Sequence, residues 1–286
     1  MQLYYYRDPR GNFGDDLNLW LWPRLLPGLL DSNADELLLG IGTLINTRVP
    51  ATSIKHVLGA GVGYGQVPVL DPTWKVRFLR GPLSCEALGL DRAAGITDPA
   101  ALVSRFVQRT EPGNSVSFMP HHLSARHLDW KEVCRLSDLQ FINPTGAVDS
   151  VIEAIAGSRL VITEAMHGAI VADALRIPWI PVRIYPQFLP FKWLDWMGSL
   201  CLDSEIHSLV PEYDGSQRSL AGRLKARIMG RLGSPRRARQ RMAAQLVQVS
   251  RRDPVLSDES RLAATVEAMT SAVDQFRKDL EDREAA

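Results

Sequence analysis

The sequence predicts an α/β protein with two doubly wound, Rossmann-like parallel sheets. Short apolar segments alternate with helical patterns along most of the chain, and this alternation is typical of parallel strands joined by helices. Glycines and polar residues gather where the predicted strands end, which is where open α/β sheets bind ligands. The 286 residues are enough for two such domains. We expect the first over residues 1–112, the second over 113–205 and a basic helical extension over 206–286.

The composition is that of an ordinary globular protein. Hydrophobic residues make up 45% of the chain and charged residues 23%, so a sizeable core is available. No apolar run reaches the roughly 20 residues of a membrane-spanning helix, and the N-terminus lacks the regions of a signal peptide, so we expect a cytoplasmic protein. The three cysteines are too few and too widely spaced for a disulfide framework or a zinc site, and we expect no metal.

The net charge of +1 conceals a strongly basic stretch over residues 218–252. No acidic residue lies between Asp214 and Asp253, whereas arginines recur throughout this segment. Such a stretch can attract an anionic membrane surface or a phosphorylated ligand, and it can equally be a solvated helical face. It lacks the interleaved aromatic residues and groove-reading motifs of nucleic-acid-binding proteins, so nucleic acid is not an expected partner.

The first half is expected to form one sheet with helices between its strands. In chain order we expect strands over residues 3–6, 36–39, 56–58 and 75–80, and helices over 17–26, 83–88 and within 96–102. The second and third strands end in glycine-rich loops, where the backbone at Gly61 can approach a sugar or a phosphate closely. Neither loop contains a dinucleotide fingerprint or the Gly-Lys-Ser/Thr of a P-loop. A linker is expected at 108–114.

The first strand leads into a loop that is dense in polar groups. Asn12, Gly14, Asp15 and Asp16 lie here, around the start of the first predicted helix. One carboxylate at this place could be an ordinary helix N-cap, but the loop offers more donors and acceptors than a cap requires. We therefore expect these residues to contact a ligand.

Arg80 lies where the fourth strand ends and the next helix begins. A guanidinium at such a place can bind a carboxylate or a phosphate through two hydrogen bonds. The alternative is a strand-end arginine paired with a neighbouring acid. Further along, Asp98 precedes a proline and is expected to cap the short helix that follows.

The second half repeats the strand and helix alternation. We expect strands over residues 115–119, 139–142, 160–163 and 179–184, and helices over 130–136, 148–156 and 169–176. The first of these strands ends in Pro120, His121 and His122. Two sheets that face one another leave a cleft between domains, and such clefts are preferred binding sites.

The segment 160–178 is the strongest candidate for a site. A buried strand is followed by a tight turn with Glu164, His167 and Gly168, then by a helix that Pro178 ends. The helix N-terminus offers free N–H groups to an anion, and Gly168 leaves the backbone open to its approach. An imidazole titrates near neutral pH and suits proton transfer. The alternative is a histidine satisfied within an ordinary turn.

Six motifs in this order resemble the polysaccharide pyruvyl transferase family. They are Asn12-Phe-Gly-Asp-Asp16, Gly40-Ile-Gly-Thr-Leu-Ile45, the loop 59–65, Arg80-Gly-Pro-Leu-Ser84, Asp98-Pro-Ala100 and Met166-His-Gly168. The resemblance covers residues 1–200 and is strongest to the exopolysaccharide enzymes of the xanthan and succinoglycan type. It implies a fold similar to GT-B glycosyltransferases, phosphoenolpyruvate as donor, no other cofactor, and a pyruvate ketal on a sugar as product. The expected acceptor is a lipid-linked oligosaccharide at the inner membrane face.

The resemblance also implies roles for individual residues. The implied donor contacts are Arg80, Ser84 and Gly168; the implied catalytic groups are His167 with Asp16 or Glu164; and the implied acceptor contacts are Asn12, Gly14, Asp15, Gly61 and His121. Many members carry an arginine two residues before the histidine, where this chain has Ala165. Arg183, Lys192 or the helix N-terminus would then share the donor phosphate. Two other functions fit the sequence: a GT-B-like glycosyltransferase that uses a nucleotide sugar, and a non-catalytic protein that binds polysaccharide or membrane.

Overall fold

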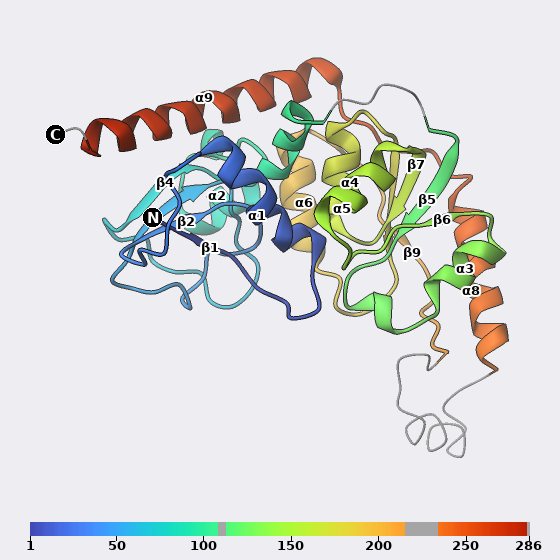
Figure 1. The fold of residues 1–286 in the computed structure, drawn as a ribbon. Coiled ribbons are helices and arrows are strands. Elements are labelled where there is room, and N and C mark those ends of the chain that lie inside the picture. The colour runs from blue at the N-terminus through green and yellow to red at the C-terminus, as the bar shows by residue number, and fades with distance from the viewer. Residues whose placement is uncertain (108–112, 215–233, 285–286) are drawn as a thin grey trace.

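The computed structural model describes residues 1–107, 113–214 and 234–284. Two parallel sheets lie side by side, each at the centre of one half of the chain (Figure 1). The α/β class with parallel sheets is thereby confirmed. Among the described helices, none combines the length and the apolar character needed to cross a bilayer. Most of the expected linker 108–114 lies outside the described residues.

The strands of the first sheet follow the order of the chain. They are β1 (Gln2–Tyr4), β2 (Glu36–Leu39), β3 (Ile54–Leu58) and β4 (Trp74–Phe78), all parallel. The helical elements of this half are α1 (Phe13–Leu25), α2 (Pro82–Leu88) and the 3-10 helices η1 (Arg92–Ala94) and η2 (Pro99–Arg105). The strand order never reverses, so this sheet differs from the doubly wound arrangement that we expected.

The difference arises in the connections after β2 and β3, which contain no helix. Side chains of β2 alternate between two faces: Leu38 packs in the cluster that contains α1, whereas Leu37 and Leu39 pack in a second cluster. That second cluster contains Ile45 and Val62 from the glycine-rich loops. The loops therefore cover the face on which a doubly wound sheet carries helices.

The second sheet has the doubly wound order. Its strands, in spatial order, are β6 (Gln140–Phe141), β5 (Ser115–Met119), β7 (Ser158–Thr163), β8 (Trp179–Arg183) and β9 (His207–Ser208). Its helices are α3 (Trp130–Leu136), α4 (Val148–Ala156), α5 (Met166–Ala174) and α6 (Pro190–Ser199), with the 3-10 helix η3 (Ser124–Arg126). The order reverses between β5 and β7. The carboxyl ends of these two strands therefore form the crevice where such sheets bind ligands.

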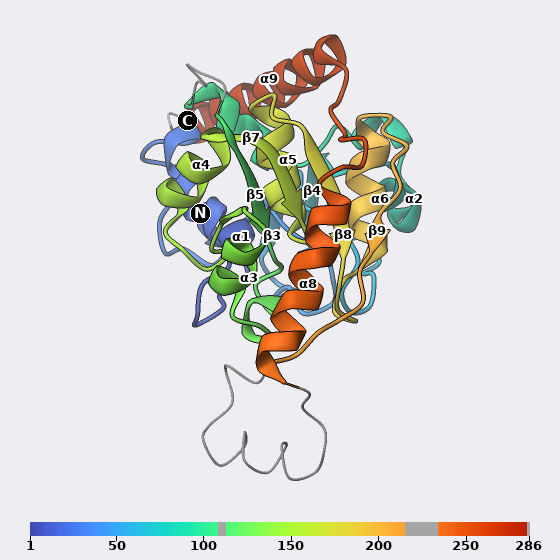
Figure 2. The ribbon, with the colours of Figure 1, turned by 90° about the vertical axis from the view of Figure 1, so that its right-hand side faces the viewer.

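The C-terminal extension is shared between the two halves. Helix α8 (Pro235–Val249) packs on α3, whereas α9 (Glu259–Glu284) runs across to β4 and η2 (Figures 1 and 2). Asp279 of α9 accepts a hydrogen bond of 2.6 Å from Arg77 of β4. Of the predicted basic stretch, residues 218–233 lie outside the described part of the chain.

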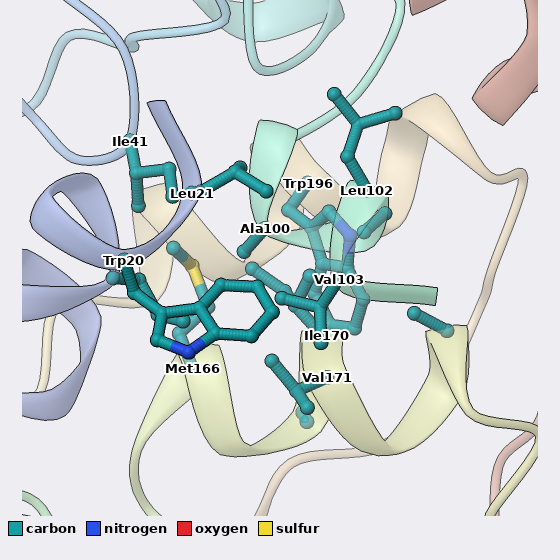
Figure 3. Packing of buried hydrophobic residues seen from close by; sticks show 14 of the residues in the cluster. Trp20, Leu21, Ile41, Ala100, Leu102, Val103, Met166, Ile170, Val171 and Trp196 are labelled. Atoms are coloured by element: carbon teal, nitrogen blue, oxygen red, sulfur yellow. The ribbon is translucent and has the colours of Figure 1, made fainter. Parts of the chain in front are cut away.

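One hydrophobic cluster joins the two halves and fixes the walls of the site. Figure 3 shows Trp20 and Leu21 of α1 close to Met166 and Ile170 of α5. Eight of the nine residues of α5 are buried, and His167 is the exception. A helix that is buried nearly all round cannot shift without disturbing the core, so the position of His167 is set by packing.

Candidate active site

A pocket of about 780 Å³ lies between the two sheets. Its wall is built from residues that follow β1, β2, β3, β5 and β7, together with the N-terminal turns of α1, α5 and α6. The lining residues are Tyr4, Tyr5, Tyr6, Arg7, Asp8, Arg10, Asn12, Phe13, Gly14, Asp15, Gly42, Thr43, Leu44, Asn46, Arg48, Tyr64, Gly65, Met119, His121, His122, Leu123, Ala165, Met166, His167, Gln187 and Lys192. Of the predicted site residues, this pocket brings together Asn12, Gly14, Asp15, His121 and His167.

His167 lies in the first turn of α5, at the end of β7. The Thr163 hydroxyl accepts a hydrogen bond of 3.0 Å from the N–H of Ala165 and donates one of 2.9 Å to its carbonyl, which shapes the turn between strand and helix. The helix begins at Met166, three residues earlier than the sequence predicted. His167 therefore belongs to the helix terminus itself, and its side chain is 15% exposed in the pocket.

Gly168 has a packing role that the sequence did not reveal. A Cβ on Gly168 would stand 2.7 Å from Met119 Sδ and 2.8 Å from Thr163 Oγ1. The residue is buried and does not line the pocket. Its lack of a side chain lets α5 approach the sheet. We expected Gly168 to contact the donor, but its burial keeps it away from the pocket.

The two ring nitrogens of His167 have different neighbours. Nε2 lies 3.6 Å from Asp98 Oδ2, and both atoms are buried without a hydrogen-bond partner. The other carboxylate oxygen of Asp98 accepts the N–H of Ala100 at 3.0 Å and caps η2, as the sequence predicted. Nδ1 lies beside Gly14, only 2.0 Å from the place where a Cβ on that residue would stand. Glycine at position 14 is therefore what allows the imidazole to occupy this place.

Asp15 and Lys192 are two half-buried charged groups in the pocket wall. Burial raises the pKa of Asp15 to about 6, although the positive charges of His167 and Lys192 oppose this shift. Asn12 Nδ2 donates a hydrogen bond of 2.5 Å to Asp15 Oδ2. Burial, together with the charge of Arg80, lowers the pKa of Lys192 to about 8. Both groups therefore change protonation near neutral pH, which suits proton transfer and anion binding.

The rings of His121 and His122 contact one another at the end of β5, with centroids 4.2 Å apart and planes tilted by 42°. Burial is the main reason that the pKa of His121 falls to about 2 and that of His122 to about 4. Both rings are neutral at physiological pH. His121 can therefore donate or accept hydrogen bonds in the pocket but carries no charge for an anion.

The other two candidate carboxylates have structural partners. Glu164 is 1% exposed and accepts backbone N–H groups from His121 at 3.2 Å and from Ile184 and Tyr185 at 3.0 Å each. It thereby holds together the ends of β5, β7 and β8. Asp16 accepts the backbone N–H of Asn12 at 3.0 Å at the start of α1. Neither side chain lines the pocket, so Asp15 is the carboxylate of the three that can reach a ligand there.

Arg80 lies behind the pocket wall and is fully buried. Its Nε pairs with Asp195 at 2.9 Å, its Nη1 donates to Thr43 Oγ1 at 2.8 Å, and its Nη2 donates to the Val62 carbonyl at 2.9 Å. Arg80 is therefore a strand-end arginine paired with an acid, which was the alternative to donor binding in the sequence analysis. The partner lies 115 residues away along the chain, so sequence reasoning could not find it.

Ser84 and Gly61 belong to the same buried network. Ser84 Oγ donates to Asp195 Oδ2 at 2.5 Å, and its N–H donates to Oδ1 at 2.9 Å. A Cβ on Gly61 would stand 2.4 Å from Cζ of Arg80, so this glycine makes room for the guanidinium. The structure thus places Arg80, Ser84 and Gly61 behind the wall. Thr43, which accepts from Arg80, and Gly42, which accepts from the Gly61 N–H, line the pocket.

Several pocket residues were missed or underrated in the sequence. Tyr4, Tyr5 and Tyr6 were predicted only as part of a strand, yet they line the pocket together with Tyr64. Lys192 was one of three candidates for the missing family arginine. Arg183, another of the three, is exposed and bonds to Ser208 at 2.9 Å instead. In the described residues, no group of three His, Cys, Asp or Glu side chains is placed to hold a metal ion.

Comparisons with known proteins identify the family of the chain. The model of the polysaccharide pyruvyl transferase family matches residues 51–184. The chain is also 36% identical to the succinoglycan biosynthesis protein ExoV of Rhizobium meliloti (strain 1021), over 98% of this chain and 99% of that protein. The chain belongs to the polysaccharide pyruvyl transferase family. No solved structure matches this pyruvyl transferase, so its expected likeness to GT-B glycosyltransferases stays a prediction.

Family membership makes the chain a transferase and confirms the resemblance that the ordered motifs predicted. The segment 51–184 contains Asp98, His121 and His167. Asp15 and Lys192 lie outside it, on α1 and α6. The pocket of this pyruvyl transferase is therefore completed by elements on both sides of the matched segment.

Proposed function

We propose that the protein transfers a pyruvyl group from phosphoenolpyruvate to two hydroxyls of one sugar in an exopolysaccharide repeat unit, which forms a ketal and releases phosphate. The observation that carries this proposal is the convergence of His167, Asp15 and Lys192 on one pocket between the two sheets. Membership of the polysaccharide pyruvyl transferase family supports the reaction class.

The reaction needs two proton transfers and an anion site. Two C–O bonds form between the central carbon of the donor and the sugar oxygens, and the bond from that carbon to the phosphate oxygen breaks. One hydroxyl proton ends on the methylene carbon, which becomes a methyl group. The other ends on the departing phosphate. The site therefore needs at least two proton-transfer groups and one cationic group close to them.

Lys192 and the N-terminal end of α5 form the donor site in this proposal. A lysine on α6 replaces the charge that the family arginine would supply at Ala165. The helix N-terminus adds a partial positive charge and free N–H groups. Arg80 supports this site from behind, because it is fully buried and donates a hydrogen bond to Thr43 Oγ1 in the pocket wall.

Asp15 and His167 carry one proton each. Asp15 has a pKa of about 6, so near neutral pH it can take a proton from the first hydroxyl and then protonate the methylene carbon. His167 takes the proton of the second hydroxyl and delivers it to the phosphate as the C–O bond breaks. Both groups return to their starting states after one turnover.

The outer part of the pocket suits the sugar acceptor. Tyr6 is 61% exposed and Tyr64 is 43% exposed, and tyrosine rings at a pocket mouth can stack on the apolar face of a pyranose ring. Asn12 and His121 supply hydrogen-bonding groups further in. A volume of about 780 Å³ has room for a three-carbon donor and a sugar ring together.

Contact with an anionic membrane is a separate part of the proposal. Arg236, Arg237, Arg251 and Arg252 are exposed on and after α8. Other basic residues of this helix are neutralised within the protein; Arg241, for example, pairs with Glu212 at 2.5 Å. The exposed arginines would bring the enzyme to a lipid-linked acceptor.

The proposal is tested by incubating the protein with phosphoenolpyruvate and lipid-linked oligosaccharide. The oligosaccharide is extracted from cells that lack this protein. We expect phosphate release that depends on the acceptor, and oligosaccharide whose mass has increased by one ketal-linked pyruvyl group. His207→Ala, which alters a histidine outside the pocket, is the control for His167→Ala. Thermal stabilisation by a nucleotide sugar but not by phosphoenolpyruvate, without phosphate release, would instead identify a glycosyltransferase.

A further inference from the structure

We propose that Asp98 is a positioning residue that orients His167, fixes which ring nitrogen handles the proton, and stabilises the imidazolium. This inference rests on the proposed function of His167. It starts from two unpaired buried atoms that face one another, Asp98 Oδ2 and His167 Nε2, at 3.6 Å.

The carboxylate of Asp98 is fully buried, and only one of its oxygens has a donor. A buried carboxylate oxygen without a donor is costly, so the site favours a proton on the nitrogen opposite it. Catalytic hydrogen bonds are often long in the absence of substrate and shorten in the complex. A small rotation of the imidazole is enough to bring Nε2 within hydrogen-bond distance of Oδ2.

The surroundings of Nδ1 complete the argument. Nδ1 lies on the side of Gly14, and both Gly14 and His167 line the pocket. When Nε2–H points to Asp98, Nδ1 is the nitrogen that remains for the substrate. His167 then accepts the proton of the second hydroxyl on Nδ1 and passes it to the phosphate oxygen, while the Nε2–H bond stays intact throughout.

Other charged and titratable groups also surround the imidazole. Asp15 faces it from α1, His121 from the end of β5, and Lys192 from the wall formed by α6. Asp15 acts in the reaction and changes its own charge, and His121 is neutral. Among the described residues, the carboxylate of Asp98 is the one that lies within ion-pair distance of a His167 ring nitrogen.

The test is Asp98→Asn, which retains an oxygen to cap η2 but removes the negative charge. We expect kcat to fall about 100-fold, within the range of one proton-transfer group, while KM for the acceptor stays within about twofold. We also expect the acidic limb of the pH–rate profile to move to lower pH by about one unit, because the imidazolium has lost its counter-charge and His167 stays neutral, able to accept a proton, down to a lower pH.

Asp91→Asn is the matched control. Asp91 caps the neighbouring helix η1 in the same manner, through a hydrogen bond of 2.8 Å from the N–H of Ala93, and it is exposed. This variant should show the wild-type kcat and pH profile. A wild-type kcat and acidic limb in folded Asp98→Asn would overturn the inference.

A measurement on the unaltered protein keeps the inference testable if Asp98→Asn fails to fold. Ring ¹⁵N shifts of His167, assigned by comparison with His167→Ala, report which nitrogen carries the proton in the neutral imidazole. We expect the Nε2–H tautomer; a dominant Nδ1–H tautomer would refute the role of Asp98. This readout needs no turnover, so it is independent of whether the donor is phosphoenolpyruvate.

Discussion

Gly14→Ala should disable the enzyme through steric displacement of a side chain on the opposite wall. The new Cβ would stand 2.0 Å from His167 Nδ1, whereas ordinary contacts begin at 3.4 Å, so the imidazole must move by about 1.4 Å. The ring cannot retreat freely, since Asp98 lies behind it and α5 is buried. A misplacement of about 1 Å at a reacting group can cost about 100-fold in rate, and we expect a fall of that size in kcat.

The free energy of unfolding should change much less. Overpacking of a tight site costs about 1–3 kcal/mol, and alanine in a helix recovers up to about 1 kcal/mol relative to glycine. A net loss of about 1 kcal/mol lowers the melting temperature by only a few degrees. Steady-state phosphate release and a thermal melt, measured on the same preparation, separate the two effects.

Gly157→Ala is the matched control, because a Cβ at Gly157 meets its nearest neighbour at 3.4 Å, an ordinary contact. Its kcat should equal that of the wild-type protein. Gly14→Ala combined with His167→Ala gives a sharper test. With the ring removed, the added methyl group should cost less stability than it does alone. A wild-type kcat for Gly14→Ala, or the same stability cost in both backgrounds, would refute the proposed contact.

Three further outcomes are expected. His167→Ala should lower kcat by about 10² to 10⁴-fold with little change in acceptor binding, whereas His207→Ala should leave phosphate release unchanged; near-normal turnover in the former would remove His167 from the mechanism. Lys192→Met should weaken donor binding about 10 to 100-fold by calorimetry. Because the lysine is charged below its pKa of about 8, affinity of the wild-type protein should fall as the pH rises above that value, and an unchanged affinity at pH 9 would contradict this role. Arg80→Ala should lower the free energy of unfolding by about 3–5 kcal/mol in chemical denaturation, because its carboxylate partner stays buried without a counter-charge. Arg77→Ala, which removes an exposed ion pair, should cost about 1 kcal/mol or less. A stable Arg80→Ala protein with weakened donor binding would instead place Arg80 in the donor site.

Local patterns in the sequence sufficed to identify the α/β class, the segment that carries His167 and the positions of four of the five strands of the second sheet; β9 lies where a helical extension was expected. A buried strand, a turn and a helix follow from periodicity and from breaker residues within about 20 neighbouring positions. The family was also accessible, because the order of several short motifs is a property of the chain alone. Gly14, Asp15 and His121 were likewise found at strand ends, where parallel sheets place their ligands.

Tertiary structure decided which polar residue has which partner. In the sequence Arg80 was a candidate donor contact, but in the folded structure it pairs with Asp195. Glu164 was a candidate catalytic group, but its carboxylate accepts three backbone N–H groups. Asp98 read as a helix cap, and only the packing of η2 against α5 places its second oxygen opposite His167. Propensity and spacing act over a few residues, whereas burial, pairing and pKa depend on neighbours that are remote in sequence. The sequence therefore determined where the site would form, and the folded structure selected the groups able to act in it.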